Sequence, residues 1–340
     1  MNLPRVSVVI PSYNRASLVG ETIENMLRQT LPPHEVIVVD DGSTDNSVEV
    51  IKAFGPRVQL IQQANRGPGA ARNAGFAAST GEFIQFMDSD DLASHNKLEV
   101  QARALIEGQA DMAYGPWVQA TFARCWVTQM NRVLQPEPVP SHLSLCEWHL
   151  RGWTPVLQNC LFRRSFLSQL GPIKEDLLVM EDGEFLNRIF LTKAKVIFTP
   201  ECLVFYRLHD VGKLTVSGTT NLQKLEHRAR GVSYIYAELQ QEAVSLKSST
   251  RFIYAWYAWQ LWREMSASGG FSPEKLDQVR RIFDAYPSVY FRAFGTWNRV
   301  VAAVRVRLTG NTWYRPYRAR HAGARELELM REVGLKFDLK

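Results

Sequence analysis

The sequence of 340 residues has few cysteines and no long apolar run. Its four cysteines, at positions 125, 146, 160 and 202, include neither a CxxC motif nor any close pair. This spacing argues against a zinc cluster and favours reduced thiols inside a folded core. No apolar stretch reaches the ~18 residues of a spanning helix, and the run at 6–10 is too short for a signal segment. We therefore expect a cytoplasmic protein without a membrane-spanning helix.

Internal repeats and low-complexity tracts are also absent, and hydrophobic residues make up 46% of the chain, enough for a sizeable core. Charge is distributed unevenly along the sequence. Residues 1–220 carry 20 basic and 23 acidic side chains, whereas residues 221–340 carry 20 and 11. The hydrophobic pattern changes at the same point to the long helical periodicity of residues 222–246 and 251–265. We predict two domains, 1–220 and 221–340.

Short apolar runs alternate with helical patterns in the first third of the sequence. The four runs that resemble buried strands are residues 6–10, 35–40, 58–62 and 83–87. Strands that alternate with helices predict an α/β fold, with a mostly parallel sheet flanked by helices. Ligands bind beyond the carboxyl ends of the strands in such sheets. Polar clusters at residues 11–14, 40–43 and 88–91 follow three of these strands, so we expect them to line one site.

The fourth strand runs directly into Asp88, Ser89, Asp90 and Asp91. Carboxylates two positions apart on a strand end can point to the same side, where they repel each other. A hard divalent cation, Mn²⁺ or Mg²⁺, relieves this repulsion and prefers oxygen ligands. The alternative is an Asp-rich turn in which Asp91 or Ser94 caps the next helix. The buried strand directly before the acids favours the metal.

The second strand ends in a similar way, with Asp40 and Asp41 followed by Gly42. Asp41 can accept hydrogen bonds from a nucleobase or a ribose. Capping of the next helix by Ser43 or Asp45 is the alternative.

The segment 67–73, GPGAARN, is not a dinucleotide fingerprint, because it follows the third strand and Arg72 stands where the third glycine is required. Small residues at a helix start let a ligand approach, and Arg72 can offer positive charge to a diphosphate. Close packing of the helix on the sheet explains the small residues equally well.

Five motifs resemble those of the family 2 glycosyltransferases and follow the same order. They are VSVVIPSYNR, VIVVDDGSTD, NRGPGAARNAG, GEFIQFMDSDD and MEDGEFLNRIF, between residues 5 and 210. The resemblance implies the GT-A fold, a Rossmann-like, mostly parallel sheet, with a mainly helical C-terminal extension. It also implies an inverting enzyme with a nucleotide-diphospho-sugar donor. It leaves the sugar and the acceptor open.

The resemblance also implies roles for individual residues. The residues expected at the donor nucleotide-sugar are Pro11, Tyr13, Asn14, Asp41, Arg72, Asp88 and Ser89. Asp90 would bind Mn²⁺ or Mg²⁺, and His209 in the motif YRLH would be a further ligand, although a lone histidine is more often a structural residue. Asp182 would be the general base, with Glu181 as the rival; acids that complement a helix dipole are the alternative. Trp153 would stack on an acceptor sugar, unless it is a core residue.

The C-terminal part contains a basic aromatic stretch. Residues 291–325 include eight arginines and no acidic residue. On a helix, one face would carry Phe294, Trp297, Val301, Val304 and Leu308. This pattern is typical of a helix in the interface of an anionic membrane, and a helix packed on the catalytic domain is the alternative. We expect no nucleic-acid partner, because no nucleic-acid motif accompanies the charge. The aromatic segment 252–262 predicts a buried helix or a contact in a homo-oligomer.

The sequence thus predicts a metal-dependent inverting glycosyltransferase that moves a sugar from a UDP-sugar to a glycan or lipid-linked acceptor. We expect it to act in surface polysaccharide synthesis, at the inner face of the plasma membrane. One alternative is a nucleotidyltransferase, but residues 11–15 lack the glycine-rich loop that such enzymes carry after the first strand. The other is a non-catalytic sugar-nucleotide binding protein, which would be expected to have lost Asp90, Asp182 or His209.

Overall fold

The structure is a computed structural model, which describes residues 3–123, 126–134, 137–151, 155–208, 221–242, 248–285, 328 and 336–337. In this part of the chain the central element is a seven-stranded sheet with the order β10-β6-β9-β4-β1-β2-β3. The strands are β1 (Val6–Ser12), β2 (Glu35–Asp40), β3 (Gln59–Gln62), β4 (Phe83–Phe86), β6 (Met112–Tyr114), β9 (Cys160–Arg163) and β10 (Val196–Phe198). All run parallel except β9, which is antiparallel to β4 and β6. The predicted α/β fold is confirmed.

Helices cover both faces of this sheet, which explains why its central strands are largely apolar and why even Ser7 of β1 and Gln85 of β4 are buried. The helices around it are α1 (Val19–Leu27), α2 (Ser47–Lys52), η1 (Gly55–Arg57), α3 (Pro68–Ala78), α4 (Lys97–Glu107), α6 (Arg164–Leu170) and α7 (Glu181–Leu191). Val8 and Ile10 of β1 belong to the core cluster that contains residues of α1 and α4. Val9 points the other way, into the cluster that contains residues of α7. Because successive side chains of β1 point to opposite faces, its carboxyl end lies between the helices on one face of the sheet and those on the other.

Helix α3 approaches β1 most closely at Gly75, where an added Cβ would overlap Cγ1 of Val9. We expect Gly75→Ala to lower the free energy of unfolding by about 1–3 kcal/mol, because the core has no room for another methyl group. The matched control is Gly183→Ala in α7, where an added Cβ meets no atom within 4 Å. That change should be neutral or stabilising by up to about 1 kcal/mol. Equal losses in urea unfolding would contradict the packing argument.

A second sheet lies beside the first, with the order β12-β8-β7-β11-β5. Its strands are β5 (Leu92–Ala93), β7 (Trp117–Ala123), β8 (Trp126–Leu134), β11 (Val204–Leu208) and β12 (Lys336–Phe337). The antiparallel pairing of β5 with β11 brings the chain just after Asp91 next to Arg207. Helix α4 begins after Asn96, and neither Asp91 nor Ser94 caps it. The alternative interpretation of Asp91 and Ser94 as helix caps is therefore wrong.

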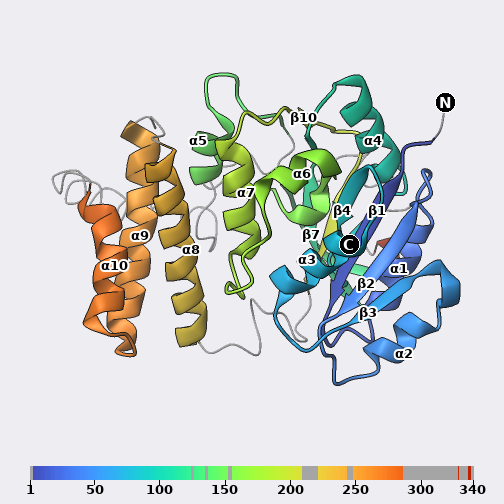
Figure 1. Cartoon of the computed structure of the whole chain (residues 1–340), viewed down its shortest axis with the longest axis horizontal. Coiled ribbons are helices and arrows are strands. Elements are labelled where there is room, and N and C mark those ends of the chain that lie inside the picture. Colours follow the sequence, from blue (N-terminus) through green and yellow to red (C-terminus); the bar gives the residue numbers. More distant parts are fainter. Residues whose placement is uncertain are drawn as a thin grey trace.

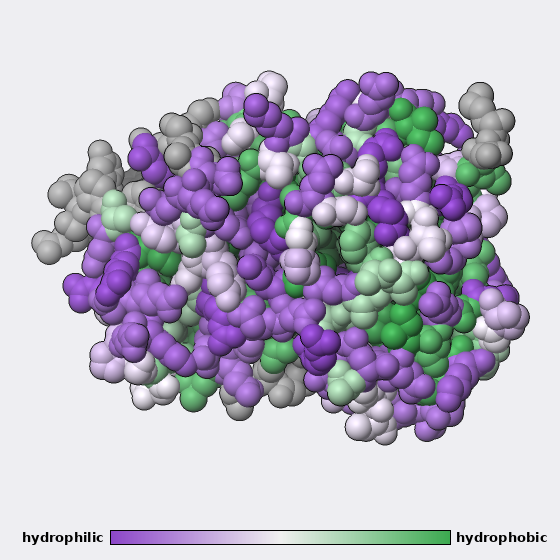
Figure 2. Space-filling model, in the orientation of Figure 1, coloured by the Kyte–Doolittle hydropathy of each residue, from purple (hydrophilic) through white to green (hydrophobic). Residues whose placement is uncertain are grey.

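The C-terminal part is helical, as the periodicity predicted. Its helices are α8 (Asn221–Gln241), α9 (Ser248–Ser268) and α10 (Pro273–Asp284), which stand side by side at the end of the molecule opposite α1 and α2 (Figure 1). Val232 of α8 and Leu261 of α9 share one core cluster with Phe185 of α7. The short helix α5 (Leu145–Leu150) contacts α7 and α9, and the short helix η2 (Leu157–Asn159) contacts β4. The surface over α8–α10 is mostly hydrophilic in the view of Figure 2.

Several sequence predictions concern residues outside the described part of the chain. These are Trp153, His209, the domain boundary at residue 220 and the basic stretch 291–325. They stay predictions. Among the helices that the structure describes, none combines the length and apolar character that crossing a membrane requires.

Candidate active site

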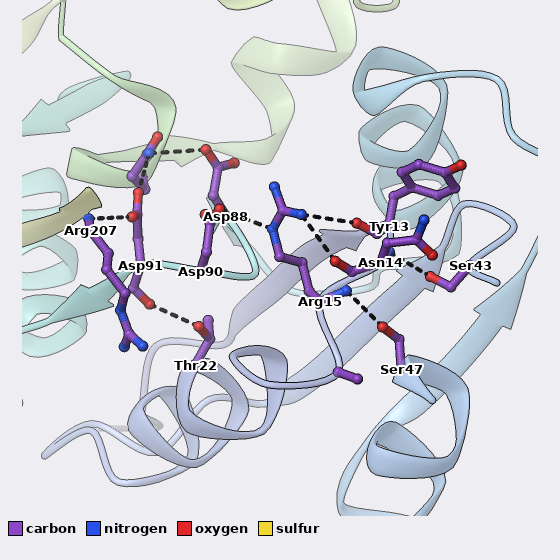
Figure 3. A network of polar contacts seen from close by, with 12 residues as sticks. Tyr13, Asn14, Arg15, Thr22, Ser43, Ser47, Asp88, Asp90, Asp91 and Arg207 are labelled. Carbon is purple, nitrogen blue, oxygen red and sulfur yellow. Dashed lines mark hydrogen bonds and ion pairs between the residues drawn. The ribbon is translucent and has the colours of Figure 1, made fainter. Parts of the chain in front are cut away.

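The loops at the carboxyl ends of β1, β2 and β4 lie against one another, as predicted. The backbone N–H of Asn14 donates to Oγ of Ser43 at 2.9 Å, and that of Arg15 donates to Oγ of Ser47 at 2.7 Å. The Arg15 side chain then reaches across to Asp90, with 3.1 Å between Nε and Oδ2. Figure 3 shows Arg15 between the acidic side chains and the first loop. The three polar clusters therefore form one site.

Three carboxylates gather where β4 ends. Asp88, Asp90 and Asp91 each offer an oxygen atom within 4.8 Å of the others. Hard divalent cations take such oxygen ligands, and a bound cation would offset the mutual repulsion of the acids. The donor set fits Mg²⁺ or Mn²⁺. His209, the predicted further ligand, lies outside the described residues.

Asp91 is the most enclosed of the three acids. It is fully buried, and its carboxylate accepts hydrogen bonds from the backbone N–H of Arg207 at 2.8 Å and from Nε2 of Gln158 at 2.6 Å. Burial, followed by the charges of Asp90 and Asp88, raises the pKa of Asp91 well above its ordinary value. Asp91 thus anchors β11 to the acid cluster, a role that the sequence analysis did not assign.

Gln158 of η2 joins two of these acids. Its Nε2 donates to Asp88 at 3.0 Å as well as to Asp91, and its backbone carbonyl accepts from Nε2 of Gln85 at 3.1 Å. Gln85 also accepts a hydrogen bond from Nζ of Lys97, a fully buried side chain whose pKa burial lowers to about 8. A series of buried hydrogen bonds, from Lys97 through Gln85 to Gln158, therefore holds Asp88 and Asp91 in place. No local motif marks Gln158, and the sequence analysis missed it.

Arg72 connects the acid cluster to α7. Its Nη2 lies 2.7 Å from Oδ1 of Asp88, and its Nη1 lies 2.9 Å from Oε1 of Glu181. The side chain is buried; burial alone would lower the pKa of Arg72, but Asp88 and Glu181 raise it above its ordinary value. Arg72 had been predicted to contact a diphosphate, and that contact stays a prediction. In this structure Arg72 holds two acids from distant parts of the chain.

Glu181 and Asp182 begin α7, directly after Met180, whose φ of 71° lies in the left-handed region. Burial and the neighbouring Asp182 raise the pKa of Glu181 to about 7, despite the opposing effect of Arg72. Burial also raises the pKa of Asp182. Glu181 is held by Arg72, whereas Asp182 is less buried and accepts a hydrogen bond from the N–H of Gly183 at 2.7 Å. Asp182 is therefore the more accessible of the two carboxylates.

Asp41 organises the loop after β3. Its two oxygens accept hydrogen bonds from Nε2 of Gln63 at 2.8 Å, the N–H of Arg66 at 2.9 Å and the N–H of Gly67 at 2.8 Å. These bonds give the carboxylate of Asp41 a structural role. Its contact with a nucleobase stays a prediction. Gly67 has a φ of 92°, and a Cβ there would lie 2.9 Å from Leu178.

The small residues that begin α3 face the loop before α7. A Cβ at Gly69 would lie 2.8 Å from the carbonyl oxygen of Lys174. Asn73 exchanges two hydrogen bonds with the backbone of Ile173, both 2.9 Å long. Close packing explains the small residues of α3. They pack against this loop at Gly69 and against the sheet at Gly75. Through these contacts α3 sets the position of the loop that leads to Asp182.

The remaining predicted donor residues lie in the same region. Pro11 is in β1, paired with Val39 of β2, and Ser89 is buried beside the acid cluster. Asn14, with a φ of 52°, accepts a hydrogen bond from the N–H of Thr44 at 2.8 Å. Tyr13 is 39% exposed and leaves its ring open to a ligand at the rim of the site. Their contacts with a donor stay predictions.

Comparison with known proteins indicates the family of this chain. The model of "Glycosyl transferase family 2" matches residues 7–171. GlyG of Streptococcus pneumoniae, a glycosyltransferase, is 41% identical over 213 residues, which cover 59% of this chain and 70% of GlyG. EpsJ of Bacillus subtilis, also named a glycosyltransferase, is 32% identical over 217 residues, or 60% of this chain. The chain spans 61% of the length of EpsJ.

Solved structures are similar at the level of the fold. Residues 1–349 of S. aureus TarS in complex with UDP-GlcNAc superpose with a TM-score of 0.58 at 20% identity, covering 82% of this chain and 79% of that one. The mannosyltransferase PcManGT from Pyrobaculum calidifontis, in complex with GDP-Man and Mn²⁺, superposes with a TM-score of 0.51 at 20% identity. The match covers 98% of this chain and 86% of PcManGT. The fold is thus GT-A. Because GlyG is 41% identical and is covered over 70% of its length, the chain belongs to glycosyltransferase family 2.

Proposed function

We propose that this protein is a metal-dependent inverting glycosyltransferase, which moves a sugar from a UDP-sugar to a hydroxyl group of a glycan or glycolipid acceptor. Family membership supports the reaction class. The UDP-GlcNAc bound to TarS and the GDP-Man and Mn²⁺ bound to PcManGT support a nucleotide-sugar donor and a metal.

The observation that carries the proposal is the pairing of two acidic groups through Arg72. Asp88, Asp90 and Asp91 form the first group at the end of β4, and Glu181 and Asp182 form the second at the start of α7. Arg72 bridges the groups with contacts of 2.7 and 2.9 Å. The group proposed to bind the cation and the group proposed to accept the proton are thus joined through Arg72, an arrangement that supports transfer from a diphosphate donor to a hydroxyl.

The residues divide the chemistry between them. Asp90, with Asp88 and Asp91 beside it, would hold Mn²⁺ or Mg²⁺, and the cation would stabilise charge on the leaving diphosphate. Asp182 takes the proton of the acceptor hydroxyl as that oxygen attacks C1 of the sugar. Attack from the face opposite the diphosphate inverts the anomeric configuration. Arg72 and Glu181 fix the distance between the two acidic groups, so that donor and acceptor are held next to each other and react as if they were one molecule.

The test is a panel of UDP- and GDP-sugars, incubated with an acceptor mixture and either Mn²⁺ or EDTA. We expect one UDP-sugar to release UDP and to form a glycoside of inverted configuration, with release falling to background in EDTA. Pyrophosphate formed from a nucleoside triphosphate would instead indicate a nucleotidyltransferase. Binding of a nucleotide-sugar without any release would indicate a non-catalytic binding protein. Release that EDTA leaves unchanged would contradict the metal.

The cellular setting is part of the same proposal. We propose a cytoplasmic enzyme in surface polysaccharide synthesis, attached at the periphery of the inner membrane face and able to form homo-oligomers. The support for an anionic membrane surface is the composition of residues 291–325, which lie outside the described part of the chain.

A further inference from the structure

Arg15 places a positive charge inside the acid cluster. Its Nε lies 3.1 Å from Oδ2 of Asp90, and the two side chains are only 11% and 13% exposed. This enclosure distinguishes the pair from the surface ion pairs of the molecule, such as Arg28 with Glu24, where Arg28 is 67% exposed. Enclosed charges are screened less by salt and water than exposed ones. Arg15 therefore neutralises part of the negative charge that a metal would otherwise neutralise.

The geometry of the first loop holds Arg15 at this position. Its Nη1 donates to the carbonyl oxygens of Asn14 at 3.0 Å and of Tyr13 at 3.3 Å, so that the side chain folds back over its own backbone. Asn14 itself has a left-handed φ of 52°. The N–H of Arg15 is fixed by Ser47 at 2.7 Å. The backbone of the loop is thus held by α2, while the guanidinium group spans from the loop to Asp90 (Figure 3).

A divalent ion and the Arg15 guanidinium group compete for the carboxylate of Asp90. When the ion takes this carboxylate, two cations stand next to each other, and Arg15 gains by moving to another anion. The diphosphate of a nucleotide is the anion that enters this site with the ion, and a guanidinium group binds phosphate oxygens in a bidentate manner. The side chain can make this move by rotation of its own bonds, without displacing the loop.

We propose that Arg15 is the resident counter-ion of Asp90, which it releases to bind the diphosphate when metal and nucleotide enter the site together. Arg15 is then a positioning residue that couples the two ligands. The metal alone binds weakly because it must displace Arg15, and the nucleotide strengthens metal binding because it offers Arg15 a new partner. This inference rests on the proposed metal-dependent function and adds a residue that the family motifs did not assign.

The test measures binding of Mn²⁺ alone by electron paramagnetic resonance, with and without UDP, and needs no sugar transfer. We expect UDP to tighten Mn²⁺ binding to the wild type by at least about fivefold, the lower end of typical coupling between two ligands. In Arg15→Gln, Mn²⁺ without UDP should bind more tightly than in the wild type, and the coupling should fall to about twofold or less. Arg15→Lys, which keeps the charge but loses the planar fork, should give intermediate values.

Arg28→Gln is the matched control, because it removes the same charge from an exposed side chain just after α1 and should leave both quantities at their wild-type values. Melting temperatures confirm that each variant is folded. Coupling in Arg15→Gln equal to that of the wild type would overturn the role of Arg15 and leave the proposed function intact. A wild type that binds Mn²⁺ neither alone nor with UDP would overturn the proposed metal and the role of Arg15 together.

Discussion

Replacement of Asp182 by asparagine should lower sugar transfer by roughly 10²–10⁴-fold, the usual contribution of a positioned general base. Asparagine has the same shape but does not take up the proton of the acceptor hydroxyl. Asp182 accepts the hydrogen bond of Gly183 within its own helix, and an asparagine Oδ1 can keep this bond. Affinity for UDP, measured by calorimetry, should therefore stay within about threefold of the wild type.

Two further variants make this experiment decisive. Asp176→Asn is the matched control, because Asp176 lies in the loop before α7 and accepts a hydrogen bond from the hydroxyl of Tyr234; it should keep full transfer. Glu181→Gln tests the rival base. If Asp182→Asn transfers sugar at the wild-type rate and Glu181→Gln does not, the base is Glu181, and Asp182 loses the role proposed for it.

Replacement of Arg72 by methionine should lower the free energy of unfolding by about 3–5 kcal/mol, the typical effect of removing one partner from a buried ion pair. The side chain of Arg72 is 6% exposed and has carboxylates on both sides, 2.7 and 2.9 Å away. Methionine fills the space but leaves Asp88 and Glu181 without their counter-ion. Guanidinium chloride unfolding measures the loss.

The loss should depend on pH. The folded-state pKa of Glu181, about 7, lies above its ordinary value, so the folded protein binds this proton more tightly than the unfolded chain does. This group therefore favours folding at low pH, and its contribution declines as the pH rises through about 7. Without Arg72 the ionised carboxylate loses its attraction, so the loss in Arg72→Met should be larger at about pH 8 than at about pH 6.

The control is Arg66→Met, which removes the same charge from an exposed pair with Glu175. Arg66 is 61% exposed, and surface pairs contribute roughly 0–1 kcal/mol. Equally small losses for Arg66→Met and Arg72→Met would show that Arg72 is not the structural link between the two acidic groups.

The strands and most helices could be predicted because their signals are local. Residues 36–39 are apolar and residues 83–87 are apolar except for Gln85, and β2 and β4 lie where this pattern placed them. Because ligand-binding loops gather at the carboxyl ends of parallel strands, the sequence alone predicted that the acids after β4 lie near the loop after β1. The reversed strand β9 was not predictable in this way, because its direction is set by pairing with β4 and β6.

The partners of the acids required the tertiary structure. Asp91 is held by Gln158, 67 residues away, and by Arg207, 116 residues away. Asp90 is paired with Arg15, 75 residues away. No spacing rule predicts such contacts, because they depend on how two sheets and several loops pack. They also changed the interpretation of Arg72, from a free cation to the link between two acidic groups.

The sequence by itself therefore determined the α/β architecture, the family and the positions of the acids, since hydrophobic periodicity and motifs are properties of contiguous residues. Only the tertiary structure decided which cation faces each acid, which acid is buried and which is accessible. The physical reason is that the charge state and reactivity of a carboxylate depend on burial and on neighbours a few ångströms away, which folding brings from distant parts of the chain.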